Sequence, residues 1–326
     1  MRRRDLLTGL AGAATFSATT GVPLPAWAQG PAPATTKLLV GATPGGGTDL
    51  VARALAQELA GRLRRGVIVD NRPGAAGNIA AGAVAKAEPD GGTLLLSYTS
   101  HAINPALFGK LPFDAVKDFT PLSLVATSPL MLVARPGLKA ANLRELVAQA
   151  KAGNTALSIA VAGVGSANHL AGEMLRVQTG LNLVSVPYKG ASPAVSDVMG
   201  NQVDLLFSNM ATVQQLVRSG KVRPLAVSTA QRVAGFPDVA PVAELVPGFD
   251  YSSWYGLFAP AGLPAEAASQ LAAATRASLA SAEMQQRLQG EGLAPVGNTP
   301  GEFAAFLRAE ISRWTQVVAA TGAKPA

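Results

Sequence analysis

Residues 37–71, KLLVGATPGGGTDLVARALAQELAGRLRRGVIVDN, alternate between two periodicities, and this alternation decides the fold. The apolar stretch at 37–42 predicts a strand, and leucines four residues apart predict one buried face of a helix over 49–63. A second short apolar stretch predicts a strand at 66–70. The segment therefore forms a strand-helix-strand unit whose first connection is rich in glycine.

The same alternation continues along the chain. A helix over 78–87 and a strand at 93–97 extend the first unit. A second unit follows, with helices expected at 143–150, 168–178, 193–199 and 213–217 and strands at 156–161, 181–186, 203–207 and 222–228. Short, nearly continuous apolar strands separated by helices predict an α/β protein whose mostly parallel sheets are flanked by helices.

Segments that join the two units suggest two lobes. Residues 101–136 are expected to be irregular, with an apolar run at 129–134 that crosses between the lobes, and the chain returns at 249–260. The last part of the chain predicts helices at 265–279, 282–289 and 301–321. One lobe then comprises 29–130 plus 250–326 and the other 131–249, with a ligand cleft between them, because such sheets bind ligands at the carboxyl ends of their strands.

The N-terminus predicts export. Residues 1–28 combine a basic start, an apolar stretch at 6–16 and the small-residue cleavage site Ala26-Trp27-Ala28, which are the marks of a secretory signal peptide. The paired arginines in Arg3-Arg4-Asp5-Leu6-Leu7 also suit the twin-arginine route, so both this route and the general secretory route remain open. We expect the mature protein, starting near Gln29, in the periplasm.

Composition excludes several classes of function. The chain has no Cys, so it forms no disulfide framework and offers no thiolate nucleophile or metal ligand. Removing 1–28 takes away three Arg and one Asp, which lowers the formal net charge from +7 to +5. The remaining Lys and Arg are scattered, which argues against nucleic-acid binding.

Three loops between strands and helices consist of glycine and small residues. They are 41–49, 71–78 and 162–169. Their backbone N–H groups can converge on an anion, and a helix start adds a favourable dipole, although a purely structural turn is the alternative for each. In the first loop, Gly47 stands where the phosphate-binding pattern requires Lys, so nucleotide hydrolysis is not expected.

Catalytic and metal-binding arrangements are not recognisable. His101 and His169 are the two histidines, and neither belongs to a paired-histidine metal motif. No G-x-S-x-G elbow or paired acid and base is present, so we expect no enzyme activity, no cofactor and no metal. Trp254 and Tyr255 are expected to pack at the junction of the lobes.

Taken in order, several motifs resemble the substrate-binding proteins of tripartite tricarboxylate transporters, also called the Bug family. The resemblance covers nearly all of the mature sequence. The motifs are PGGGTD at 44–49, DNRPGAAGN at 70–78, AEPDG at 87–91, KDFTP at 117–121, GSANHLAGE at 165–173, VPYKG at 186–190, GNQVD at 200–204 and SWYGL at 253–257.

The resemblance implies a two-lobed periplasmic binding protein fold, the Venus-flytrap fold, in which the first two loops hold a ligand carboxylate and the second lobe closes over its other end. The residues that it places at the ligand are Gly46, Thr48, Asp49, Ala76, Gly77, Asn78, Ser166, His169, Asp204 and Ser208. Two departures stand out: Gly41-Ala42 replaces a common Pro-Phe-like pair, and Ser208 replaces a common Asp. Without that Asp, an organic mono- or dicarboxylate is a better ligand than an amino acid.

The leading hypothesis is a monomeric solute-binding protein that delivers a small organic carboxylate to the membrane permease subunits of a tripartite transporter. An exported receptor that reports ligand occupancy to a sensor kinase is the alternative, since it would use the same cleft. A periplasmic hydrolase is a third hypothesis that lacks a recognisable nucleophile and base.

Overall fold

The first sheet contains the predicted strand-helix-strand unit. In this computed structural model, residues 34–324 are described except 162, 189 and 234, so the predicted signal peptide at 1–28 lies outside the described residues. Three parallel strands form the start of the sheet, in the order β2 (Gly66–Asn71), β1 (Thr35–Val40) and β3 (Thr93–Tyr98). Helices α1 (Gly47–Leu63) and α2 (Asn78–Val84) connect them, so the predicted elements are confirmed.

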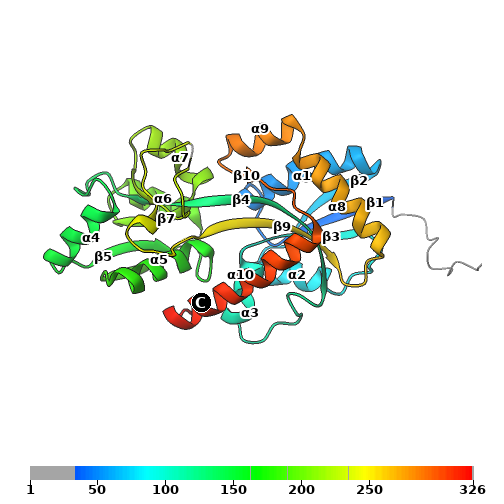
Figure 1. Cartoon of the computed structure of the whole chain (residues 1–326), viewed down its shortest axis with the longest axis horizontal. Helices are drawn as coiled ribbons and strands as arrows, with labels where there is room; N and C mark the ends of the chain where they lie inside the picture. The colour runs from blue at the N-terminus through cyan, green and yellow to red at the C-terminus, as the bar shows by residue number, and fades with distance from the viewer. Residues whose placement is uncertain (1–33, 162, 189, 234, 325–326) are drawn as a thin grey trace, which may run out of the picture. The chain divides into compact units, whose positions relative to one another are not determined.

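Two long antiparallel strands connect the first sheet with a second one. Strand β9 (Ser252–Pro260) pairs with β3 and, along most of its length, with β4 (Phe119–Ala134). The far end of β4 then pairs with strands of the second sheet, as Figure 1 shows. The expectation of an irregular segment at 101–136 is therefore wrong: α3 (Ser100–Leu107) and β4 occupy most of it.

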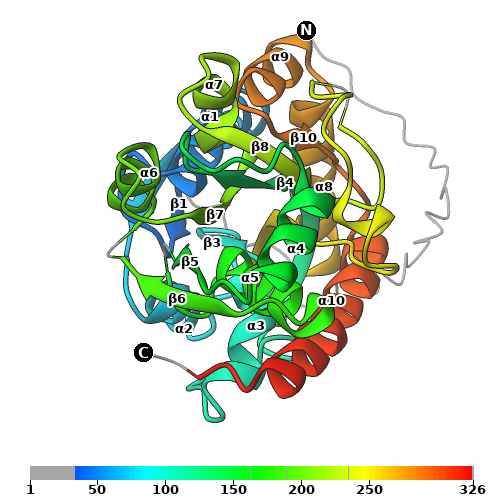
Figure 2. The same ribbon diagram turned by 90° about the vertical axis from the view of Figure 1, so that its left-hand side faces the viewer.

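The second sheet also combines parallel strands with the antiparallel β4. Its order is β8 (Arg223–Val227), β4, β7 (Leu205–Asn209), β5 (Leu157–Val161) and β6 (Leu183–Pro187). Helices α4 (Leu143–Ala152), α5 (Ala167–Thr179), α6 (Ala191–Met199) and α7 (Met210–Arg218) flank it, as seen in Figure 2. These elements match the predicted second α/β unit to within a few residues.

Alternating side chains of the strands bury both faces of the sheets. In β1, Leu38 and Val40 pack toward α1 while Leu39 joins the core on the opposite face. In β7, Phe207 packs in the core beside α5 and Leu206 packs in the core beside α6, on the opposite face. Burial on both faces explains why these strands appear in the sequence as continuous apolar runs.

The C-terminal helices cover the first sheet. They are α8 (Ala265–Leu279), α9 (Ala282–Gly290) and α10 (Pro300–Thr321). Helix α10 begins with a capping box between Thr299 and Glu302 and packs against α3, α5 and β4. One face of α10 is apolar; it is buried at Phe303, Leu307, Trp314 and Val317 and partly buried at Phe306, Ile311 and Val318. Among the described residues, no helix is long and apolar enough to cross a membrane.

Candidate functional site

A cavity of about 180 Å³ lies where loops of both sheets meet. The residues that line it are Thr48, Tyr98, Thr99, Ser100, Ser166, Ala167, Asn168, Asn209, Ser253, Trp254 and Tyr255. From the first sheet, Thr48 lies at the start of α1, Tyr98 ends β3, and Thr99 and Ser100 follow it. From the second sheet, Ser166 precedes α5, Ala167 and Asn168 begin α5, and Asn209 ends β7. The last three residues lie on the crossing strand β9.

Four helices begin at this cavity. Thr48 is in the first turn of α1, and Ser100 is the first residue of α3. From the second sheet, Ser166 caps α5 and Asn209 precedes α7. Because each helix start carries a partial positive charge and free N–H groups, the cavity favours an anionic ligand.

The cavity wall supplies neutral donors. Among the described residues that line it, none carries a formal charge, and most have a hydroxyl or carboxamide group. Burial raises the pKa of Tyr255 to about 12, and burial also raises the pKa of Tyr98. Both phenols therefore stay protonated near neutral pH. A carboxylate can accept several such hydrogen bonds without an Arg or Lys partner.

In the first loop, Asp49 holds the backbone and leaves Thr48 at the cavity. The buried Asp49 carboxylate accepts hydrogen bonds from Gly45 N at 2.9 Å, Arg53 Nε at 2.9 Å and Asn71 Nδ2 at 3.0 Å. Burial acts to raise the pKa of Asp49, but these donors hold it below its usual value. The carboxylate is thus ionised and satisfied by the protein itself. Gly46, the residue before α1, is exposed.

The second loop lies behind the cavity wall. Ala76, Gly77 and Asn78 are not among the lining residues, but Gly77 lies against two groups near the cavity. A Cβ added to Gly77 would be 3.2 Å from the Tyr98 hydroxyl, and one added to Gly41 would be 2.5 Å from Gly77 Cα. The two predicted glycine-rich loops are therefore in contact, and Tyr98 connects the second loop with the cavity.

In the third loop, the side chains of Ser166 and His169 each accept a hydrogen bond from a backbone N–H of the same loop. Ser166 Oγ accepts from His169 N at 3.3 Å, and His169 Nδ1 accepts from Gly165 N at 3.1 Å. Burial lowers the pKa of His169, which keeps the ring neutral at pH 7. Ser166 lines the cavity while His169 does not, so His169 shapes the loop that presents Ser166.

The structure does not bring Asp204 and Ser208 to the cavity. Asp204 precedes β7 and binds Arg135 Nε at 2.8 Å and Ser158 N at 2.8 Å, whereas the cavity lies beyond the opposite end of this strand. Although burial acts to raise the pKa of Asp204, Arg135 and Ser158 hold it below its usual value. Ser208 is buried within β7, and its neighbour Asn209 lines the cavity instead. We leave Asp204 and Ser208 out of the proposed binding set.

Sequence reasoning missed several lining residues. Thr99 and Ser100 follow β3, and Asn209 ends β7, so all three occupy carboxyl ends of strands. That position is the signal that could have identified them, because ligands bind at this edge of open α/β sheets. Trp254 and Tyr255, expected to pack at the junction, are buried there and also line the cavity.

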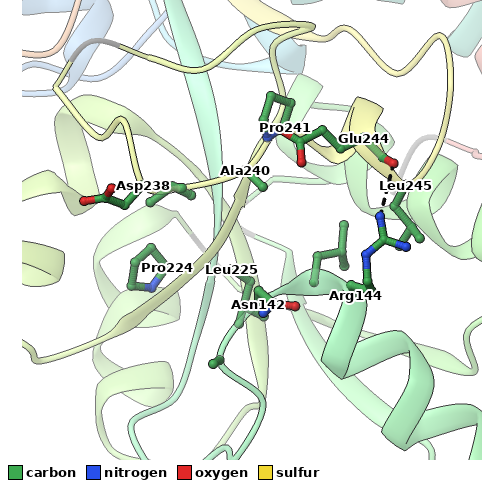
Figure 3. A pocket seen from close by; sticks show the side chains of 12 residues that line it. Asn142, Arg144, Pro224, Leu225, Asp238, Ala240, Pro241, Glu244 and Leu245 are labelled. Atoms are coloured by element: carbon green, nitrogen blue, oxygen red, sulfur yellow. Dashed lines mark hydrogen bonds between the residues drawn. The ribbon is translucent and has the colours of Figure 1, made fainter.

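A larger cavity lies elsewhere, beside α4 and the short helix η3 (Val242–Glu244). Figure 3 shows this space, which measures about 410 Å³. Charged residues line it, and Arg144 Nη2 approaches Glu244 O at 3.5 Å. It contains none of the residues predicted to bind ligand. In the part of the chain that the structure describes, no group of three or more His, Cys, Asp or Glu side chains could hold a metal ion.

The two sheets, the crossing strands and the cavity between them define a periplasmic binding protein fold. The chain belongs to the tripartite tricarboxylate transporter family receptors, whose family model matches residues 51–323. It is similar to protein BugT of Bordetella pertussis, with 38% identity over 95% of this chain and 96% of the relative.

Solved structures of periplasmic binding proteins resemble this one over nearly their whole length. The structure of BugD is 33% identical with a TM-score of 0.79, covering 90% of this chain and 99% of BugD. A protein of R. palustris with adipate is 33% identical with a TM-score of 0.82, at the same coverage of 90% and 99%. MatC from Rhodopseudomonas palustris with bound malate is 33% identical with a TM-score of 0.77, covering 88% and 99%. The family and these neighbours are substrate-binding proteins, not enzymes.

Proposed function

We propose that this protein captures a small organic carboxylate in the cavity between its sheets and delivers it to the permease subunits of a tripartite membrane transporter. One observation carries the proposal: four helix starts and a set of neutral donors surround a single small cavity. This arrangement suits an anion that accepts many hydrogen bonds.

The chemistry of the ligand follows from the two groups of helix starts. Helices α1 and α3 follow strands of the first sheet, and α5 and α7 follow strands of the second. A dicarboxylate places one anionic end at each group, so we favour it over a monocarboxylate. The adipate and malate in the two similar solved structures are both dicarboxylates, which supports this preference.

Delivery requires two lobes that close on the ligand. We propose that 29–130 plus 250–326 form one lobe and 131–249 the other. Closure is driven by contacts that the ligand makes only in the closed state. The protein acts as a monomer in the periplasm, after export by the general secretory or the twin-arginine route.

A ligand screen tests the proposal. The purified protein is heated with aliphatic and aromatic mono- and dicarboxylates and with the uncharged amide of each. At about 100-fold excess over its dissociation constant, a ligand adds roughly 2.7 kcal/mol to the free energy of unfolding, which raises the melting temperature. We expect a shift with a carboxylate and none with its amide. Equal shifts with both, or no shift with any carboxylate, would refute carboxylate capture.

A matched pair of variants locates the site. Thr48→Val removes a hydroxyl at the cavity, whereas Thr315→Val removes an exposed one on α10. We expect only Thr48→Val to weaken binding in calorimetry. The partner is tested separately, by co-purification of the ligand-loaded protein with permease subunits; recovery of a sensor kinase instead would favour the receptor alternative.

A further inference from the structure

Asn104 is a buried polar side chain that connects α3 with the second glycine-rich loop. Its exposed fraction is 2%. The amide nitrogen Nδ2 donates to Ala76 O at 3.1 Å and to Asn78 Oδ1 at 2.6 Å. The opposite orientation of the amide would direct Oδ1 at two acceptors, so hydrogen bonding requires the observed one. Asn104 thus binds the loop through both donors of one nitrogen.

The loop that Asn104 binds has a strained backbone. Ala75 and Ala76 have φ angles of +46° and +52°, and Gly77 has a φ of +90°. Left-handed backbone is unfavourable for alanine because its Cβ approaches the carbonyl oxygen, and it persists only where surrounding contacts hold it. The bond from Asn104 to Ala76 O is such a contact, and it acts directly on a strained residue.

This loop supports the wall of the cavity. Gly77 lies against Gly41 of the first loop and against the hydroxyl of Tyr98, which lines the cavity. Ser100, one turn before Asn104 on α3, also lines the cavity. A shift of 75–77 would therefore displace the first loop and Tyr98 while α3 stayed in place.

We propose that Asn104 is a positioning residue of the binding site: it holds Ala75–Gly77 in the left-handed conformation and thereby fixes Gly41 of the first loop and Tyr98 in the wall of the cavity where the carboxylate binds. Asn104 does not line the cavity, so the proposed role acts through the loop and not through contact with the ligand. The inference rests on the proposed function, since it assigns a determinant of affinity to the same site.

The test separates positioning from general stability by rescue. Asn104→Ala removes both donors, and we expect carboxylate affinity, measured by calorimetry with the best ligand of the screen, to fall about tenfold, as for the loss of one or two hydrogen bonds. Ala76→Gly added to Asn104→Ala should restore affinity to within about threefold of the wild type, because glycine adopts positive φ without the Cβ penalty. Rescue by a residue that makes no new contact is not expected if Asn104 only stabilises the core.

Two further variants serve as controls. Asn104→Leu fills the same space without a donor, so it should reproduce the affinity loss if Asn104→Ala fails to fold. Asn142→Ala removes the amide that accepts from Glu145 N at the start of α4, away from the cavity. We expect it to lower the melting temperature and leave affinity unchanged.

Hydrogen exchange supplies a readout that needs no ligand. Gly77 N donates to Gly74 O at 3.0 Å, and Asn78 N donates to Ala75 O. In Asn104→Ala these amides should exchange about tenfold faster, while those of α10 stay unchanged. Unchanged loop exchange, unchanged affinity or failure of Ala76→Gly to rescue would overturn the inference. A wild type that binds no carboxylate would instead refute the proposed function.

Discussion

At the scale of single residues, Gly77 and Gly46 occupy loops with different tolerance for a side chain. Gly77 has a φ of +90° and lies against Tyr98. Gly46 has a φ of −84°, and a Cβ added to it would have only Thr43 O within 4 Å, at 3.6 Å. We predict that Gly77→Ala lowers the free energy of unfolding by about 1–2 kcal/mol and weakens ligand binding about tenfold or more. Gly46→Ala should change the free energy of unfolding by less than about 1 kcal/mol.

Urea unfolding and calorimetry measure the two effects. Because both variants add one methyl group, their comparison isolates the backbone conformation and the contact with Tyr98. If the two variants lose affinity equally, the loss comes from blocked approach of the ligand to the first loop and not from strain in the second loop.

His101 makes stability depend on pH. Its ring is fully buried, stacks on Phe258 at 4.7 Å between centroids and has Nε2 2.9 Å from Ala115 O. Burial lowers the pKa of His101 from 6.5 to about 4, and the bond to Ala115 opposes this only in part. Because the folded protein binds the proton more weakly than the unfolded chain, stability is complete above pH 6.5 and falls as the pH decreases toward 4. The loss totals roughly 3 kcal/mol.

The variant His101→Phe tests this assignment. Phe keeps an aromatic ring beside Phe258 and has no proton to bind. Urea unfolding between pH 7 and 4 should show a shallower loss of stability in the variant than in the wild type. Parallel curves would assign the acid sensitivity to other groups, including His169, whose pKa burial also lowers.

The candidate site was predictable where position in the chain determines position in space. Thr48 and Ser166 follow strands and lie at the starts of helices, and both line the cavity. Asp49 and His169 also lie in these loops, but their side chains bind neighbouring backbone. Sequence does not show whether a polar side chain is occupied by its own loop, because this depends on backbone angles that only the folded loop fixes.

At the scale of elements, α10 is connected to the crossing strand β9 through Glu310. This buried carboxylate accepts hydrogen bonds from Trp254 Nε1 of β9 and from Trp314 Nε1 of its own helix, both at 2.9 Å. Replacing Glu310 with Leu leaves two buried indole N–H groups without an acceptor. We predict that Glu310→Leu lowers the free energy of unfolding by about 3 kcal/mol, measured by urea unfolding.

Thr299→Ala is the comparison on the same helix. It removes the side chain that caps α10 and should cost about 1 kcal/mol without affecting β9. Tryptophan fluorescence should change in the folded state of Glu310→Leu alone. If Glu310→Leu lowers the free energy of unfolding no more than Thr299→Ala does, the hydrogen bond that Glu310 accepts from β9 contributes little to stability.

Elements with strong periodicity were predictable, and crossing elements were not. Helix α10 shows its apolar stripe directly in the sequence. Strand β4 contains Pro121 and Pro129, and α3 contains Pro105, so local patterns favour irregular structure there. Pairing with β9 and burial among other elements override these local preferences, and such long-range partners are not visible in one sequence.

At the scale of the whole described chain, the cavity is shared by two sheets that meet along β4 and β9. Helices that follow strands of each sheet begin at the same space, so the proposed ligand with two anionic ends would contact both groups of helix starts. A ligand with one anionic end gains from only one group of helix starts. The family resemblance implies that the first two loops hold that end, and the first of them contains Thr48.

This division predicts a difference between two variants. Thr48→Val alters the end of the cavity formed by the first sheet, and Ser166→Gly alters the end formed by the second, with only a few tenths of a kcal/mol lost from the α5 cap. Thr48→Val should weaken mono- and dicarboxylates alike, by about tenfold each. Ser166→Gly should weaken a dicarboxylate to a similar extent and leave the monocarboxylate of matched length within about twofold. Calorimetry with the four combinations of variant and ligand gives the result: if Ser166→Gly weakens both ligands equally, the second group of helix starts does not bind a separate anionic end, and the preference for dicarboxylates is wrong.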